Sequence, residues 1–130
     1  MSDRDVNHLH PDLLILYREW LMRCHAAKLA VKVICTWRSA EEQNIAKAKG
    51  FSKAAAGQSP HNCVDDKGNP ASKAFDFAVF DEDARYVTNG SDSRYRQAGE
   101  IGEQVGLVWG GRFKSIFDPG HLEMKNWKLT

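Results

Sequence analysis

Three residues have the types and surroundings expected of ligands to a catalytic metal ion. His61 and His121 lie beside turn residues, where extended segments are predicted to begin, and Asp76 lies within an apolar run. An ionised carboxylate in such a run needs a cation or strong hydrogen-bond donors beside it. Catalytic zinc commonly takes three protein ligands and keeps a fourth position for water. Together the three predict one Zn²⁺ per chain, although each histidine alone is more often a surface residue and Asp76 alone could pair with a lysine or arginine.

The segment 118–121, Asp-Pro-Gly-His, predicts a partner for this metal site. Proline at the second position and glycine at the third favour a type II turn, which brings the first and last Cα atoms within about 7 Å. Asp118 would then lie beside His121, where its carboxylate can take a proton from metal-bound water. The segment therefore predicts Asp118 as a general base. By itself, the tetrapeptide also fits an aspartate that only opens a turn.

The cysteines predict no disulfide framework. Cys24, Cys35 and Cys63 are odd in number and have no C-x-x-C spacing, which also argues against a cysteine-rich zinc module. We therefore expect reduced thiols. Cys63 has a second interpretation, as a substitute metal ligand, because it lies close after His61.

Length and charge limit the classes of function. A chain of 130 residues is expected to form one catalytic domain, residues 1–130. The formal charge of +1 gives no general reason to bind nucleic acid or an anionic membrane. The polar N-terminus and the short apolar stretch 13–16 resemble neither a signal peptide nor a membrane span. We expect a monomer made in the cytoplasm, without nucleic-acid or membrane partners.

The segments that must position these residues have helical and extended patterns in turn. Apolar spacing predicts a helix over 11–28, a capping box at Ser39 opens another that ends at Gly50, and a third covers 91–105 with close packing at Gly99 and Gly102. Strands are predicted over 31–37, 73–80, 107–109 and 121–124, and loops over 54–60 and 62–71. This order predicts a single small α+β domain, an antiparallel sheet with flanking helices.

These motifs, in this order, resemble the VanY-like zinc peptidases. That family includes D-alanyl-D-alanine carboxypeptidases and the L-alanyl-D-glutamate endopeptidases used as phage endolysins. Its ligands come from a segment S-x-H-x-x-G-x-A-x-D and a later (D/E)-x-x-H, which residues 59–61, 74–77 and 118–123 resemble. An arginine at a strand-to-helix junction is similar to Arg38, and Trp-Gly-Gly at 109–111 agrees as well. The resemblance spans most of the chain.

One departure from the family pattern lies between the first two ligands. Asp76 follows His61 at a greater distance than in the family segment, with extra residues around 64–71, and Ser72 stands where the family usually has glycine. The extra residues are turn-forming, and a longer loop adds little closure cost. We therefore expect the two ligands still to converge.

The resemblance implies a fold and roles for particular residues. It implies a hedgehog/D,D-peptidase-like domain that holds zinc through His61, Asp76 and His121, with Asp118 as the base. Arg38 would bind substrate and stabilise the oxyanion. Ser59 and Gln43 would support substrate binding. The alternative for Arg38 is a surface ion pair with a neighbouring glutamate.

The resemblance also implies a substrate, bacterial peptidoglycan. We expect hydrolysis of the stem peptide between L-alanine and D-glutamate, because a lone catalytic domain suits an endolysin that accumulates in the host cytoplasm and reaches the wall after membrane breach. One alternative is a D-alanyl-D-alanine carboxypeptidase, which would normally need export. Another is a non-catalytic, zinc-stabilised wall-binding domain, which would have no need for Asp118 beside a zinc ligand.

Overall fold

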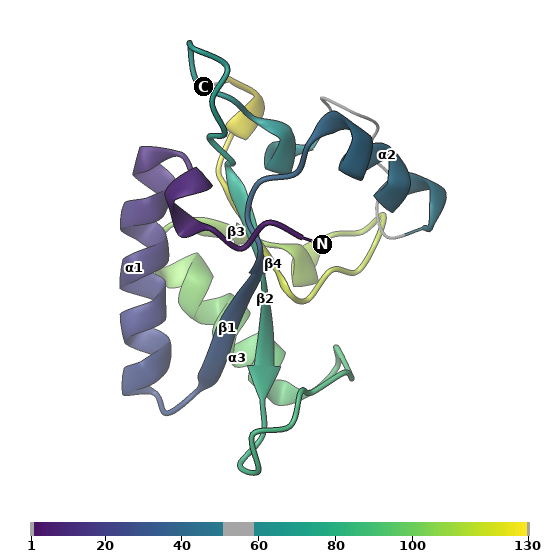
Figure 1. Cartoon of the computed structure of the whole chain (residues 1–130). Coiled ribbons are helices and arrows are strands. Elements are labelled where there is room, and N and C mark those ends of the chain that lie inside the picture. Colours follow the sequence, from purple (N-terminus) through teal and green to yellow (C-terminus); the bar gives the residue numbers. More distant parts are fainter. Residues whose placement is uncertain (1, 51–58, 130) are drawn as a thin grey trace.

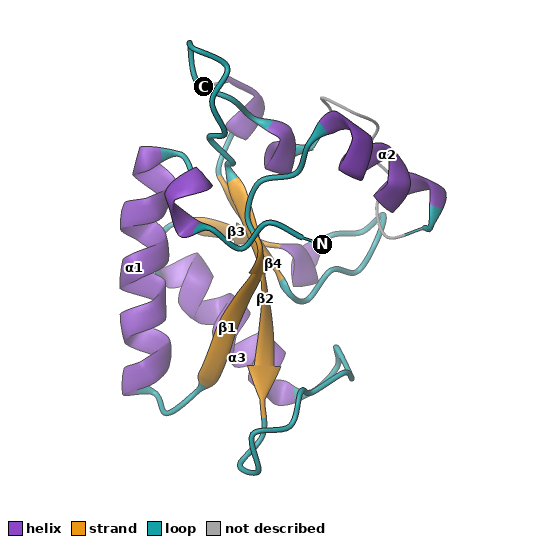
Figure 2. Cartoon of the chain, in the orientation of Figure 1, coloured by secondary structure: helices purple, strands orange, loops and turns teal. Residues whose placement is uncertain are grey.

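The computed structural model describes residues 2–50 and 59–129, which form an α+β arrangement of helices around a four-stranded antiparallel sheet (Figures 1 and 2). The elements are α1 (Pro11–Ala26), β1 (Ala30–Cys35), α2 (Ala40–Ala48), β2 (Ala74–Phe80), α3 (Ser93–Gln104), β3 (Leu107–Trp109) and β4 (His121–Met124). Short 3-10 helices cover Val6–His8, Pro60–Asn62, Gly110–Arg112 and Trp127–Leu129. The predicted fold class is confirmed. Of the loop predicted at 54–60, residues 54–58 lie outside the described part of the chain.

The strand order places segments that are distant in sequence side by side. The order is β1-β2-β4-β3, so β4 lies between β2 and β3 and pairs antiparallel with both. In Figure 1, α1 and α2 lie on opposite sides of the strands. The two strands that carry Asp76 and His121 are therefore central neighbours.

The core lies on one face of the sheet. Phe75 and Phe77 of β2 are fully buried, and each ring centroid lies 5.1 Å from that of Trp20 on α1. The Trp20 indole N–H donates to the carbonyl of Ala98 over 2.9 Å, so its buried donor is satisfied. This face holds the aromatic side chains that give a small domain its apolar burial.

Helix α1 covers this core with one apolar stripe. Pro11 stands at its start, and buried residues follow at helical spacing: Leu13, Tyr17, Trp20 and Cys24. The helix ends at Ala26, slightly before the predicted end, and Lys28 has a φ of 61° in the turn to β1. Within the described residues, no helix combines the length and the apolar character needed to cross a membrane.

Helix α3 approaches the sheet closely because two of its residues lack side chains. A Cβ at Gly99 would lie 2.2 Å from the Trp109 ring, and one at Gly102 would lie 2.4 Å from Leu122. The predicted close packing at both glycines is confirmed. It lets α3 lie directly on β3 and β4 and so supports the strand that begins at His121.

Helix α2 begins at the predicted capping box. The Ser39 hydroxyl accepts from the Glu42 N–H, and the Glu42 carboxylate accepts from the Ser39 N–H, both over 3.2 Å. Gly50 follows the helix with a φ of 77°. The cap matters for the site because it fixes the chain direction immediately after Arg38.

Candidate metal centre

A row of three side chains crosses the sheet on the face opposite the core. Asp76 on β2 pairs with Cys35 on β1 and with His121 on β4. Directly opposed residues in antiparallel strands have Cβ atoms about 5 Å apart. The sheet register thus brings a thiol, a carboxylate and an imidazole together from three strands.

A β-bulge in β1 determines which side chain joins this row. Val33 lies opposite Phe77, but the register then shifts, so that Cys35 lies opposite Asp76. In a regular ladder, Cys35 would lie opposite Phe75, on the core face. The bulge therefore turns Cys35 toward the site while Val33 remains packed against the core.

His61 enters the site from the 3-10 helix Pro60–Asn62, near the start of the second described range. The Ser59 hydroxyl caps this helix by accepting from the His61 N–H over 3.2 Å. His61 is 3% exposed, and its Nδ1 donates to the carbonyl of Thr36 over 2.7 Å. A carbonyl can only accept, so Nδ1 carries the proton and Nε2 faces Asp76 Oδ1 at 3.3 Å. This is the orientation that a histidine ligand needs.

The extra residues between His61 and Asp76 form a closed excursion. The Ala71 N–H donates to the carbonyl of Cys63 over 2.9 Å, and Val64 and Pro70 form an antiparallel bridge. Within the loop, Asp65 Oδ1 accepts from the backbone of Lys67 and Asn69. The chain therefore returns to where it left, and the expected convergence of His61 and Asp76 is what the structure shows.

His121 is held through both ring nitrogens. Nδ1 lies 3.0 Å from Asp76 Oδ1, and Nε2 donates to Glu123 over 2.8 Å. Glu123 follows at the next position on the same strand face, a spacing visible in the sequence, yet we assigned it no role there. Its carboxylate fixes the ring so that Nδ1 points at the site.

The turn before His121 closes as expected but is not type II. The His121 N–H donates to the carbonyl of Asp118 over 3.2 Å, and Asp118 Oδ2 lies 3.8 Å from His121 Nδ1. A type II turn needs a positive φ at its third residue, and Gly120 has none. Glycine is required there for a different reason: a Cβ would lie 2.6 Å from the carbonyl oxygen of Phe77. The turn type predicted from the sequence was therefore wrong, whereas the predicted proximity of Asp118 and His121 is what the structure shows.

Arg38 reaches the site from the junction between β1 and α2. Its Nη2 lies 3.6 Å from Asp76 Oδ2, and its Nη1 donates to Gln43 Oε1 over 2.9 Å. The Gln43 side chain is fully buried, so it acts on Arg38 and not on solvent. The backbones of Arg38 and His61 are also hydrogen-bonded directly.

The charged side chains of the site shift one another's pKa values. Burial alone would lower the pKa of His61, but the Asp76 carboxylate outweighs it and raises that pKa to about 10. The pKa of His121 shifts in the same direction. Burial would lower it, but Asp76 and Glu123 raise it to about 9. Burial would raise the pKa of Asp76, yet the two imidazolium groups hold it well below its usual range. A metal ion that binds here must displace imidazole protons.

Asp118 has a different environment from Asp76. Burial and the negative charge of Asp76 raise the pKa of Asp118 above the usual aspartate value. Its side chain is 45% exposed, so water can reach the carboxylate. A carboxylate with a raised pKa beside a wet site is suited to accept a proton.

Among the residues that the structure describes, two overlapping groups of side chains have donor atoms close enough to hold a metal ion. One is Asp76, Asp118 and His121, and the other is Cys35, His61 and Asp76. Asp76 belongs to both, and the imidazole and carboxylate donors suit a divalent transition metal. The thiol nearest to the site is that of Cys35, whose Sγ lies 4.0 Å from His61 Nδ1. The sequence offered Cys63 as the substitute ligand, because the bulge that places Cys35 beside Asp76 could not be predicted from it.

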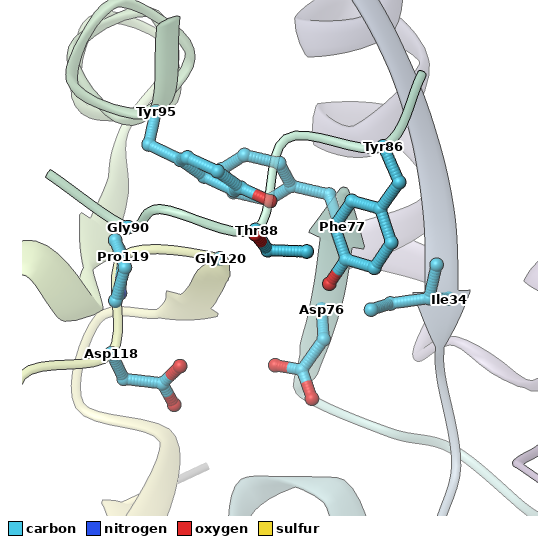
Figure 3. Close-up of a pocket in the computed structure, with 10 residues that line it drawn as sticks. All are labelled: Ile34, Asp76, Phe77, Tyr86, Thr88, Gly90, Tyr95, Asp118, Pro119 and Gly120. Atoms are coloured by element: carbon cyan, nitrogen blue, oxygen red, sulfur yellow. The ribbon is translucent and has the colours of Figure 1, made fainter. Parts of the chain in front are cut away.

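A pocket of about 220 Å³ opens beside the two aspartates. Figure 3 shows both carboxylates at one end of it, with Tyr86 and Ile34 on one side and Pro119 and Gly90 on the other. The pocket gives a ligand access to Asp76 and Asp118. No local sequence pattern indicates this pocket, because its walls come from segments that lie far apart in the chain.

Solved structures share this fold. The L-Ala D-Glu endopeptidase ChiX of Serratia marcescens is 19% identical, with a TM-score of 0.72 over 95% of this chain and 88% of that one. VanYB in complex with D-alanine-D-alanine is 16% identical, with a TM-score of 0.62 over 92% and 73%. A mutant of the vancomycin resistance D,D-pentapeptidase VanY in complex with Zn(II) is 16% identical, with a TM-score of 0.61 over 92% and 74%.

Comparison of the sequence with family models gives the family, which structural matches at such low identity do not. Among curated proteins, none matches the chain significantly. A family model described as D-alanyl-D-alanine carboxypeptidase matches residues 25–124, which include Arg38, His61, Asp76, Asp118 and His121. Since the match covers most of the chain and every candidate site residue, this protein belongs to the D-alanyl-D-alanine carboxypeptidase family.

Proposed function

We propose that this protein is a zinc-dependent peptidase that hydrolyses the stem peptide of bacterial peptidoglycan, at the bond between L-alanine and D-glutamate. The observation that carries the proposal is the meeting of two buried histidines on one carboxylate oxygen. His61 Nε2 and His121 Nδ1 lie 3.3 and 3.0 Å from Asp76 Oδ1. Three donors of these types from three segments match a catalytic zinc site with a position left for water.

His61, Asp76 and His121 would hold one zinc ion per chain. Bound zinc supplies Lewis acidity, which polarises a carbonyl group and lowers the pKa of water. Thr36 and Glu123 orient the two imidazoles, through the carbonyl on Nδ1 of His61 and the carboxylate on Nε2 of His121. Such outer partners raise the basicity of the ligands and fix their direction.

Asp118 would accept the proton of the attacking water. It lies beside the ligand His121 without belonging to the ligand set, and its pKa is raised by burial and by Asp76. The same carboxyl group can then return the proton to the leaving amine. A pKa raised above the usual aspartate value makes this carboxylate a better proton acceptor.

Arg38 would bind the substrate from the other side of Asp76. Its guanidinium is planar and carries several N–H donors, and the buried Gln43 fixes one of its nitrogens. It can pair with a carboxylate of the peptide or stabilise the oxyanion that forms during attack. Ser59 would contribute indirectly, since its hydroxyl caps the helix that carries His61.

The choice of bond rests on how much of each solved peptidase this chain covers. This chain covers 88% of the L-Ala D-Glu endopeptidase ChiX and 73% of VanYB. The second candidate is hydrolysis of the D-alanyl-D-alanine bond, which the family description and the D-alanine-D-alanine complex of VanYB favour. Mass spectrometry of fragments from purified peptidoglycan separates the two, because each bond leaves different new termini.

Asp118→Asn tests the mechanism. The change keeps size and turn geometry but removes the basic carboxylate, so turnover should fall about 10²- to 10⁴-fold. Zinc content, measured by elemental analysis, and thermal stability should stay near wild type. Arg38→Ala should also keep zinc, with a defect that includes a higher KM. Turnover near wild type in Asp118→Asn would overturn the assigned base, and a zinc-free active enzyme would overturn the whole proposal.

A further inference from the structure

The N-terminal segment, residues 3–10, lies at the end of the sheet where β1 finishes and β2 begins. In Figure 1 it runs from the start of α1 across the strands toward the N-terminus. Leu9 anchors it in the core, with 3% of its surface exposed. The family model matches residues 25–124, so this segment lies outside the matched part of the chain. Family membership therefore assigns it no role.

One end of the segment holds Thr36, the first residue after β1. The Thr36 N–H donates to the carbonyl of Asp3 over 2.7 Å, and the Thr36 hydroxyl donates to the same oxygen over 3.4 Å. Strand β1 ends at Cys35, so the ladder with β2 does not extend to Thr36. Thr36 is fully buried, and a buried N–H without an acceptor is costly. The Asp3 carbonyl therefore fixes the chain at Thr36.

Thr36 in turn contacts the metal centre. Its carbonyl accepts from His61 Nδ1 over 2.7 Å, and this hydrogen bond leaves Nε2 facing Asp76. The Arg38 N–H also donates to the His61 carbonyl, over 2.9 Å. The junction between β1 and α2 is thus bonded to the N-terminal segment on one side and to His61 on the other. A displacement of Thr36 would change the direction of the His61 ring.

The other end of the segment holds the chain before β2. The Ser72 N–H donates to the His8 carbonyl, and the Ser72 carbonyl accepts from the His10 N–H, both over 2.8 Å. The Ser72 hydroxyl donates to the carbonyl of Ala74, the first residue of β2, over 2.6 Å. The segment therefore ties the end of β1 to the start of the strand that carries Asp76.

The side chains of the segment fix its own conformation. Asp3 Oδ1 accepts from the Asp5 N–H over 2.8 Å, and Asp3 Oδ2 lies 2.6 Å from His8 Nδ1. Asp5 Oδ1 accepts from the Asn7 N–H over 2.9 Å and caps the short helix Val6–His8. These bonds hold the Asp3 carbonyl in place before Thr36 pairs with it, so little freedom is lost in that contact.

We propose that Asp3 is a positioning residue for the metal centre: the N-terminal segment holds Thr36, whose carbonyl keeps the His61 ring in the direction that zinc binding requires. The inference rests on the proposed function, because it takes His61 as a zinc ligand. Asp3 acts through Thr36 and not on the metal or the substrate. A segment outside the family match thereby raises the affinity for zinc.

Substitutions at Asp3 test this role. Asp3→Ala removes the carboxylate that fixes the segment, and Asp3→Gly also adds backbone freedom. The zinc dissociation constant, from chelator competition at one pH, should rise about tenfold in Asp3→Ala and further in Asp3→Gly. Asp3→Asn keeps an acceptor oxygen for the Asp5 N–H and should recover part of the loss. Arg4→Ala, at the exposed neighbouring position, is the matched control and should stay within about twofold of wild type.

Two imidazole NMR signals of the metal-free protein separate positioning from a general loss of stability. The His61 Nδ1–H, bonded to Thr36, should exchange with solvent at least about tenfold faster in Asp3→Ala and Asp3→Gly than in wild type. The His121 Nε2–H, bonded to Glu123 on its own strand, should keep its exchange rate.

Equal acceleration of both signals, or unchanged His61 exchange in both variants, would overturn the inference. So would unchanged zinc affinity in both variants of a zinc-binding protein. Because the exchange measurement needs no metal, faster exchange at His61 alone in a protein that binds no zinc would keep the link from Asp3 to His61 and refute the proposed function.

Discussion

The two faces of β2 share one backbone and are held by different forces. On one face, Phe75 and Phe77 are fully buried against Trp20 and need no charged partner. On the other, Asp76 interacts with His61, His121 and Arg38. Apolar burial depends little on pH, whereas the charged cluster depends on protons and on a bound metal. Substitutions on the apolar face should therefore mainly change the free energy of unfolding, and substitutions on the charged face should mainly change metal binding and activity.

The largest expected effect is the response of the charged face to pH. Both imidazoles have raised pKa values, about 10 for His61 and about 9 for His121, so both hold protons at pH 7. Because zinc must displace them, its affinity should fall by up to about a hundredfold per pH unit between pH 8 and pH 6. Competition with a chromophoric chelator measures this slope. A pH-independent affinity would show that the imidazoles are neutral before zinc binds.

The same groups set the sign of the pH dependence of folding without metal. The raised pKa values of His61 and His121 add stability below about pH 6.5, which is lost as pH rises through about 9 to 10. The lowered pKa of Asp76 adds stability above about pH 4, which is lost in more acidic solution. Thermal unfolding of metal-free protein should therefore occur at lower temperature at both extremes. A flat profile from pH 5 to 10 would contradict the cluster.

Next in size is damage to the core face. Phe75→Ala should lower the free energy of unfolding by about 3–5 kcal/mol, because it leaves a cavity beneath Trp20. The fraction that stays folded should still bind one zinc ion. Urea unfolding measures the first quantity and elemental analysis the second. Ile15→Ala, at a position 66% exposed on α1, is the control and should change stability by less than about 0.5 kcal/mol.

A smaller effect is expected from the support of His121. Glu123→Ala removes the carboxylate that accepts from Nε2, so zinc affinity should fall about 10- to 100-fold. Glu123→Gln keeps an acceptor oxygen and should lose less. Chelator competition at one pH ranks the three proteins. Equal affinities in all three would mean that the histidine is oriented by packing alone.

The smallest effects are expected at the cysteines. Cys63→Ser and Cys35→Ser should both keep zinc, because the Cys35 thiol approaches the His61 nitrogen that already donates to Thr36. Zinc content by elemental analysis decides this for each variant. Loss of zinc in Cys35→Ser would identify a thiolate ligand and correct the assigned set.

Local patterns in the sequence determined the elements and the residue types of the site. The capping box at Ser39, the alternation in β2 and the close approach at Gly99 and Gly102 were each readable from short segments, because the interactions involved are local or need only a missing side chain. The choice of His61, Asp76, Asp118 and His121 also came from local context and from the order of motifs, and their roles remain proposals.

Only the tertiary structure decided how these residues meet. The bulge that turns Cys35 toward Asp76, the Thr36 carbonyl on His61 and the insertion of β4 beside β2 all depend on pairings between distant segments. The turn at Gly120 was mispredicted for the same reason, since its glycine is required by the Phe77 carbonyl of another strand and not by its own dihedral angle. Sequence spacing encodes dihedral preference and periodicity, but strand register and close approach are set by the partner across the sheet.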